Sequence, residues 1–557
     1  MASFALPPHG EEVQLLRWLD SLDGEAESVK REVSKSWQEQ IRQVRGDQWR
    51  IERPPHFLAN ITKNQVRRKI ALLTESKPQI QIRSQRANLT RASDVLYQTS
   101  RSIWDRSGTE DSIYRLAHFG MTVGSGFLHV PYDPLINDVE ISFIDPRRVY
   151  IDPGISAAPD LRKAQYLRID SVVSLADLRA RFPGRGATVK PDERVSSYDE
   201  SKGRGSILAS VLAMMPRVYR PGAGAKVGPI PRAEVREYWL RDPQLNTEGT
   251  LLYPGGRHIV RAGSVILLDE ANPYWDGEWP IEMFEWDVDY DTPWGMGEVQ
   301  DLRRIQEAVN RLGDAWVSNR LLGSNFRVVA DVDALDPDQW AALDNDAGLI
   351  VRKKPNRQFE YQPPVPDDGT MPQTIQALIQ LCDLLTGNIA ERSRQAQPTD
   401  MEGLQFSRQT LVRSVARRLE TMLERIGQKL ISRVFQFYTS DKVLFQMGPS
   451  REWIAYTFER QRLLQDDDGR VRETEERQEM WRDFKFMIIP FSSLAVTRIQ
   501  RVMAALQLRS ATGVAPSIKR ILAEADMGDP DTLIEEGIEE AKRLPQPPPP
   551  KGRSGRP

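Results

Sequence analysis

The chain has 557 residues, enough for several domains or for one elongated subunit with protruding parts. Its 76 Lys and Arg residues nearly balance 78 Asp and Glu residues, which excludes a global attraction to nucleic acid and leaves only local charge asymmetry. The single cysteine, Cys382, excludes an intramolecular disulfide framework and suits a reducing cytoplasm. It lies in an apolar run, so we interpret it as a buried small hydrophobe rather than a catalytic thiol.

Targeting and membrane signals are not expected. The first residues lack the basic start and long apolar core of a signal peptide. No window approaches about 18 uninterrupted apolar residues, the length needed for a membrane span. We therefore expect a soluble intracellular product.

The N-terminal part predicts helices and one strand. A charged helix over residues 11–45 begins with apolar positions and becomes polar, so we expect its later part to be solvated. A second helix is predicted over 60–74, and strict polar–apolar alternation over 79–83 predicts a half-buried strand. One long helix is predicted over 91–121.

From Gly124 the pattern changes to short strands joined by Gly and Asp-Pro turns. The predicted strands after the first turns cover residues 139–144, 165–169, 235–240, 258–262, 264–268 and 281–286. Residues 184–231 combine Gly, Pro, Ser and Arg with little periodicity, which predicts a partly mobile insertion.

The central stretch, residues 293–440, predicts a succession of helices without a catalytic motif. A helix over 298–322 leads to a compact β-rich excursion over 326–366, and a second helix follows over 372–390. A flexible loop over 392–403 precedes a long amphipathic helix over 407–438. After it, short strands over 453–458 and 484–490 flank an acidic linker, helices follow between 494 and 544, and a Pro-rich disordered tail ends the sequence.

The long helix carries an excess of basic residues, including Arg408, Arg413 and Arg417. Two interpretations remain open. These residues form either a solvated face of a packed helix or a surface that follows a phosphate backbone without reading bases.

Few residues of the sequence fit a catalytic or nucleotide-binding motif. Gly120, Gly124 and Gly126 cluster without the Lys-Ser/Thr pair of a phosphate-binding loop, which indicates turns rather than nucleotide binding. The five histidines are scattered singly, so no zinc site is expected. His118 and His129 flank the glycine turn, and we expect them to make local hydrogen bonds.

Paired carboxylates are the remaining enzymatic signal, because two-metal nucleases use little else. Asp331 and Asp333 lie close together, as do Asp336 with Asp338 and Asp344 with Asp346. Asp336 followed by Pro337 is typical of a helix N-cap, and the later pair is typical of the turn that ends the same short helix. We expect no metal, no cofactor and no enzymatic activity, with a metal-dependent nuclease or packaging enzyme as the alternative.

Four stretches in order resemble portal proteins of tailed double-stranded DNA bacteriophages, of the podovirus type. They are residues 119–130, residues 145–153, the Trp294-Gly295-Met296-Gly297 motif with Gln306 and Asn310, and residues 405–409. The similarity extends over about residues 60–540, and the order of the stretches is more specific than any one of them.

The resemblance implies an elongated α+β portal fold, with an α/β wing, a two-helix stem, a small α/β clip, a long helix after a tunnel loop, and a helical crown. The implied boundaries are 1–59 for an N-terminal helical arm, 60–295 for the wing with the insertion 184–231, 296–322 for the first stem helix, 323–368 for the clip, 369–391 for the second stem helix, 392–405 for the tunnel loop, 406–440 for the long wing helix, 441–496 for the return strands, 497–544 for the crown and 545–557 for the tail.

The resemblance also implies a function. Portal subunits form a ring, usually a dodecamer, at one capsid vertex of the virion after assembly in the host cytoplasm. Double-stranded DNA is packaged and ejected through the ring, without sequence specificity. The implied partners are the terminase large subunit, head-completion or adaptor proteins, tail proteins, the major capsid protein and the scaffold, with no membrane. Another kind of head–tail adaptor is a further alternative.

Site residues follow from the resemblance by position. The tunnel loop would present Arg392, Arg394, Gln395, Gln397, Asp400 and Glu402 to DNA. The clip would bind its partners through Arg327, Trp340, Arg352, Lys353, Lys354 and Arg357. Opposite charges nearly balance in the loop, as expected where DNA must slide, because strong counterion-release binding would arrest translocation. The sequence departs from the portal pattern in two places. It turns Pro-rich at Pro545, which argues against the long C-terminal helical barrel of some podovirus portals, and the insertion 184–231 has no counterpart that can be placed in the family.

Overall fold

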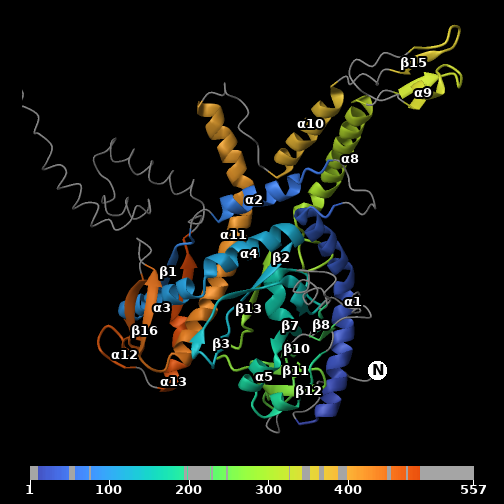
Figure 1. Ribbon diagram of the computed structural model, residues 1–557. Coiled ribbons are helices and arrows are strands. Elements are labelled where there is room, and N and C mark those ends of the chain that lie inside the picture. Colours follow the sequence, from blue (N-terminus) through green and yellow to red (C-terminus); the bar gives the residue numbers. More distant parts are fainter. Residues whose placement is uncertain are drawn as a thin grey trace, which may run out of the picture.

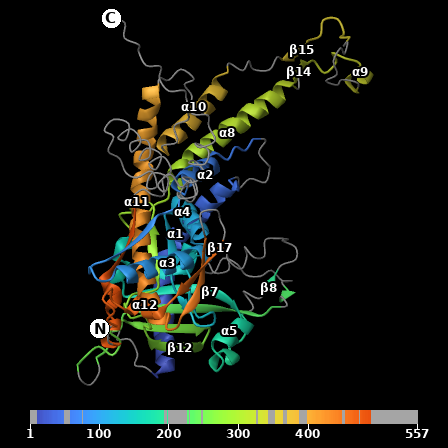
Figure 2. The same ribbon diagram turned by 90° about the vertical axis from the view of Figure 1, so that its left-hand side faces the viewer.

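The computed structural model describes residues 10–48, 57–74, 77–192, 197–198, 226–227, 230–245, 249–324, 327–341, 352–362, 369–386, 398–447, 453–471 and 474–489. Helices and sheets are mixed, as the α+β class requires. A body of sheets and covering helices carries three projecting helices, one of which ends in a small tip of two strands and a short helix (Figures 1 and 2). The predicted crown and tail lie outside the described residues.

Two antiparallel sheets form the centre of the body. The larger has the order β12-β11-β10-β7-β6. Its strands are β6 (Val149–Ile151), β7 (Tyr166–Ser174), β10 (Arg232–Leu240), β11 (Arg257–Ala262) and β12 (Val265–Ala271). The smaller has the order β13-β2-β5, with β2 (Ser125–His129), β5 (Ser142–Ile144) and β13 (Ile281–Glu285). Together they carry most of the strands that the sequence predicts.

Helix α1 (Glu12–Arg45) runs along the large sheet as one continuous element. Leu15, Leu19 and Leu22 pack on the sheet, and the helix ends at Gly46, whose φ of 95° places it in the left-handed region. The prediction that the later part is solvated is wrong, because Trp37 is buried. Tertiary contacts with α2, α4 and α8 cover it, and these neighbours lie far away in the sequence.

The single long helix predicted over residues 91–121 is in fact two helices. α3 (Thr90–Arg106) and α4 (Thr109–Val123) are separated at Gly108, which has a φ of 59°. A positive φ cannot continue a right-handed helix, so the chain turns there. α2 (Ile61–Leu73) packs against α4, and its N-terminus is capped by Asn60, whose side chain accepts from Lys63 N at 3.0 Å.

The central stretch forms α8 (Val299–Ser324), the tip, α10 (Thr370–Leu385) and α11 (Pro398–Phe437). The tip consists of β14 (Arg327–Ala330) paired with β15 (Phe359–Gln362), together with α9 (Pro337–Ala341). α11 begins at Pro398, so the loop boundary at residue 405 and the helix start at Ser407 are corrected. Proline suits a first helical turn, where its missing N–H is not needed for a hydrogen bond within the helix.

After α11 the chain returns to the body. β16 (Lys442–Met447) pairs with β17 (Trp453–Phe458), and β18 (Phe484–Ile488) pairs with β1 (Ile80–Ser84). The remaining elements are β3 (Tyr132–Asp133), β4 (Asp138–Val139), α5 (Leu175–Arg181), β8 (Ser197–Tyr198), β9 (Lys226–Val227), α12 (Arg460–Leu464), α13 (Thr474–Arg477) and short 3-10 turns at Pro146–Arg148, Ala158–Lys163, Arg185–Thr188 and Met480–Asp483. β8 and β9 pair with each other inside the predicted insertion.

Close backbone approach explains two of the glycine motifs. Gly124, with a φ of 97°, lies against Gly295, and a Cβ there would collide with the Gly295 carbonyl. A Cβ on Gly297 would come within 2.6 Å of the Thr122 carbonyl oxygen. The end of α4 and the start of α8 therefore meet backbone to backbone, which only residues without a side chain permit.

Candidate functional site

The projecting helices are the first part of the site. α8 and α10 lie side by side, and α11 rises beside them (Figures 1 and 2). The seam between α8 and α10 is apolar, with Leu302, Val309 and Cys382 buried. Burial raises the pKa of the Cys382 thiol to about 11, so the residue is a buried hydrophobe, as predicted, and not a thiolate nucleophile at neutral pH.

Amide side chains join the projecting helices to the body. Gln306 on α8 accepts hydrogen bonds from Ile61 N at 2.9 Å and Thr62 N at 3.1 Å. It thereby supplies an acceptor to two backbone N–H groups at the start of α2, which have no partner within that helix. Its own amide donates to Asn310 Oδ1 at 3.0 Å. Gln306 and Asn310 belong to the motif that resembled portal proteins, and their buried positions show that they hold the fold together.

The second helix of the pair is held in the same way. Gln65 on α2 donates to Asp383 Oδ1 on α10 at 2.6 Å and accepts from Thr386 Oγ1 at 3.1 Å. We call Gln65, Gln306 and Asn310, with Gln43 on α1, the amide joint. Gln43 donates to Thr62 Oγ1 at 3.1 Å, so the joint links α1, α2, α8 and α10.

The tip presents basic side chains and one partly exposed tryptophan. Arg352, Lys353, Lys354 and Arg357 are exposed, and Trp340 on α9 is 38% exposed. Lys354 pairs with Asp336 at 2.8 Å and Arg357 with Asp333 at 3.4 Å. Arg327 lies on β14 opposite Gln362. The structure thus gathers the predicted clip residues on one small unit.

The carboxylates of the tip serve the fold rather than a metal. Asp331 Oδ2 accepts from Gln358 N at 3.0 Å, and Asp333 and Asp336 are ion-paired. Asp336 directly precedes α9, at the N-cap position that the sequence predicts. In the part of the chain that the structure describes, no group of three potential ligands is placed to hold a metal ion. Asp344 and Asp346 lie outside the described residues.

The basic residues of α11 separate into two groups. Lys429 is buried, pairs with Glu282 at 2.8 Å, and donates to the Trp279 carbonyl at 2.6 Å. Arg433 is fully buried, pairs with Asp276, and stacks over the Tyr274 ring at 4.0 Å. These two residues bind the helix to the body and present no charge to a phosphate backbone.

The residues predicted to form a basic surface lie nearer the start of α11. Arg417 is exposed and Arg413 is half-buried, while the side chain of Arg408 is outside the described set. Arg392, Arg394, Gln395 and Gln397 of the predicted tunnel loop also lie outside the described residues. Asp400 and Glu402 fall within the first turns of α11, with undescribed side chains. The DNA-facing assignment therefore stays a prediction.

A buried charge cluster under α1 was not predicted. Asp23 accepts from Arg168 Nη1 at 2.7 Å and from the Tyr238 hydroxyl at 3.0 Å, and its other oxygen binds Arg236 and Arg261. Burial alone would raise the pKa of the Asp23 carboxyl, but the three arginines outweigh it and lower the pKa. The available signal was an aspartate within the apolar stripe of a helix, together with charged residues at alternate positions of β7 and β10.

Two half-buried histidines have pKa values shifted in opposite directions. His129 is half-buried at the end of β2, and desolvation lowers its pKa to about 4. Its Nε2 has no hydrogen-bond partner within the described structure, so the predicted local hydrogen bond is wrong for that atom. His258 stacks on Trp239, with Nε2 3.0 Å from Glu237 Oε1 and Nδ1 3.7 Å from Glu270 Oε1. Burial would lower the pKa of His258, but these carboxylates outweigh it and raise the pKa to about 8.

The raised pKa of His258 predicts that the free energy of unfolding depends on pH. A raised pKa in the folded state means that the contribution is complete below pH 6.5 and is lost as the pH rises through about 8. The loss is about 2 kcal/mol for a shift of this size. Urea unfolding at pH 6.5 and pH 8.5 measures it, and in His258→Gln the difference between the two pH values should shrink. An unchanged pH dependence in that variant would contradict the assignment.

Within the described residues, no helix is long and apolar enough to cross a membrane. The described residues form a mixed body of sheets and helices, with paired projecting helices and a basic tip. The family model of the phage P22-like portal protein matches residues 27–471, most of the chain. No curated protein matches.

The chain therefore belongs to the phage P22-like portal protein family, and the resemblance noted in the sequence is confirmed. Membership implies a bacteriophage protein of the capsid vertex that acts in DNA packaging. It also implies an oligomeric ring with capsid and terminase partners, in a family whose members are generally structural rather than enzymatic.

Proposed function

We propose that copies of this chain form a dodecameric ring around a DNA channel at one capsid vertex. The genome is packaged through the ring and later ejected through it. The observation that carries this proposal is the family match, which extends from within α1, through the projecting helices and the tip, to the body strands after α11.

Each part of the subunit has a role in this proposal. The body, residues 60–295 with α11 and the return strands, is the wing, and α8 and α10 are the stem. The tip is the clip, which docks the terminase large subunit during packaging and adaptor and tail proteins afterwards. Its exposed lysines and arginines suit an acidic partner surface, and the partly exposed Trp340 suits an anchor at the centre of such a contact.

Microscopy of the purified protein tests the proposal. Negative-stain images should show rings of uniform size with a central hole wide enough for duplex DNA. A monodisperse monomer at high protein concentration would contradict it. The nuclease alternative has no support from the tip, because Asp331 and Asp333 are engaged in hydrogen bonds and ion pairs.

Reversal of two charges tests the tunnel loop. In Arg392→Glu/Arg394→Glu we expect ring assembly to survive and packaged DNA to fall by roughly tenfold or more, because two added acidic residues in each subunit repel the phosphate backbone. The measurement is nuclease-protected DNA in particles. A matched control is Arg115→Glu/Arg482→Glu, two exposed arginines of the body. Normal packaging in the loop variant would show that the loop is assigned wrongly.

A further inference from the structure

The hairpin of β16 and β17 carries an exposed apolar face. Val443, Phe445 and Trp453 are 61%, 53% and 54% exposed. They share a face because residues two apart in a strand point the same way, and Trp453 lies opposite Met447 in the register. The alternate residues Leu444 and Phe458 are buried, so the hairpin is apolar on both faces, and among the described residues only one of these faces is covered.

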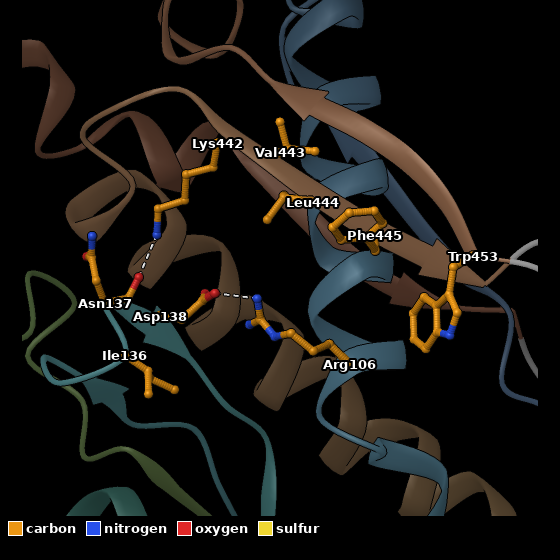
Figure 3. A pocket seen from close by; sticks show the side chains of 9 residues that line it. All are labelled: Arg106, Ile136, Asn137, Asp138, Lys442, Val443, Leu444, Phe445 and Trp453. Carbon is orange, nitrogen blue, oxygen red and sulfur yellow. Dashed lines mark hydrogen bonds and ion pairs between the residues drawn. The ribbon is translucent and has the colours of Figure 1, made fainter.

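A cavity of about 560 Å³ adjoins this face (Figure 3). Ile136, from the turn between β3 and β4, borders it opposite Val443 and Phe445. The charged groups at the cavity are occupied: Arg106 pairs with Asp138, and Lys442 donates to the Asn137 carbonyl at 2.6 Å. What is left for a partner is an aromatic and aliphatic surface, the composition typical of an interface core.

Helix α1 presents a surface of small side chains on the other flank of the body. In Figure 1 the hairpin and α1 lie on opposite sides, and in Figure 2 the hairpin lies in front of α1. Ser21, Gly24 and Ser28 are exposed and share one face of the helix because they are three and four residues apart. We call them, with the 44% exposed Val29, the α1 strip.

The α1 strip can be covered at little cost. The hydroxyls of Ser21 and Ser28 already donate to the carbonyls of Trp18 at 2.7 Å and Glu25 at 2.8 Å, so a partner need not supply hydrogen bonds. A Cβ on Gly24 would meet no atom within 4 Å. Bulky side chains such as Phe445 and Trp453 can therefore approach this helix closely.

We propose that the hairpin face of one copy docks on the α1 strip of the next copy in the ring. A closed ring requires two different surfaces of each subunit to meet, and these two lie on opposite flanks. The inference rests on the ring of the proposed function and adds which wing surfaces close it.

Charge placed on the exposed hairpin face tests the contact. In Phe445→Glu we expect the protein concentration at half-assembly to rise by about tenfold or more, because desolvating a carboxylate in an apolar interface is unfavourable. The matched control is Tyr290→Glu, an aromatic residue that is 92% exposed, which should assemble normally. Mass photometry measures assembly, and an unchanged melting temperature of the dissociated subunit shows that Phe445→Glu still folds.

Cross-linking identifies the occupant. Phe445→Cys/Ser28→Cys, treated with a short bismaleimide in assembled rings, should give a ladder of covalent multimers on a denaturing gel. Each single variant should not give it. Rings of the double variant without a ladder, or Phe445→Glu rings that assemble normally, would overturn the inference while leaving the proposed function intact. A photo-cross-linker at position 445 that captured the capsid protein in particles would also overturn it, whereas a wild-type chain that forms no rings would overturn the proposed function itself.

Discussion

Replacement of Asp23 by alanine is expected to lower the free energy of unfolding by about 3–5 kcal/mol, the range for breaking a buried ion pair by removing one partner. The Asp23 carboxylate faces Arg168, Arg236 and Arg261, and Arg168 is 1% exposed. Without it, the three guanidinium groups lose the one carboxylate that they share, and each keeps a single closer acid: Asp170 at Arg168, Glu234 at Arg236 and Asp20 at Arg261. Urea unfolding at pH 7 measures the change.

The neighbouring acid supplies the control. Asp20 also pairs with Arg261, at 2.7 Å, but its side chain is 69% exposed. Asp20→Ala should therefore cost less than about 1 kcal/mol, as exposed pairs do. Equal effects of the two variants would show that the cluster under α1 contributes through something other than buried charge. Because the pKa of Asp23 is lowered in the folded protein, its contribution to the free energy of unfolding is present above pH 3.8 and is lost as the pH falls further.

Replacement of Lys429 by alanine is expected to have a similar effect, about 3–5 kcal/mol, because Glu282 would stay buried without its principal partner. The side chains of Lys429 and Glu282 are 4% and 3% exposed, and the two carbonyls that Lys429 binds would also lose their donor. Arg425 lies 3.9 Å from Glu282 and is too distant for a hydrogen bond. The same unfolding experiment applies.

Arg417 is the matched control on the same helix. It is exposed, so Arg417→Ala should change the free energy of unfolding by no more than about 0.5 kcal/mol. If both variants were equally mild, the buried ion pairs of α11 would not be what fastens it to the body. The pair of variants thus separates basic residues that stabilise the fold from basic residues available to a ligand.

The sequence could not make that separation. Lys429 and Arg417 look alike in a helix whose apolar residues recur every three or four positions. Their difference comes from Glu282, which lies on β13 far earlier in the chain and which the fold brings to Lys429. Asp276, just before β13, pairs with Arg433 in the same way. Whether a charged residue is buried depends on such tertiary pairing, which the spacing of apolar residues along the helix does not predict.

Elements with strong local signals were predicted well. α8 and the tip follow the predicted order, since helical periodicity and Asp336-Pro337 are local features. The break at Gly108 was missed because the helical pattern was read across a single glycine. The early start of α11 at Pro398 was missed because its first turns are polar, so a proline followed by acidic residues was interpreted as a loop.

The residues of the candidate site also differ in how far the sequence could predict them. The clip residues were predicted by position from the resemblance, and the structure places them on one small unit. Their role in binding partners stays a prediction. The role of Gln306 and Asn310 came only from the resemblance, and their hydrogen bonds to α2 and to each other explain their presence at the start of α8. The tunnel-loop residues remain a prediction.

Amide side chains help to hold α8 and α10 to the body, and neutral amides do not titrate near physiological pH. Salt screens exposed charges over about 10 Å at 0.1 M, but it does not weaken hydrogen bonds between uncharged groups in this way. The ion pair of Lys69 with Glu298 is largely buried and is screened little, whereas the pairs of Arg68 with Asp383 and of Arg303 with Glu39 are partly exposed and are screened more. In the amide joint, the hydrogen bonds of Gln306 with the α2 backbone and with Asn310 join uncharged groups, so we expect added salt to weaken the exposed ion pairs around the joint while these bonds persist.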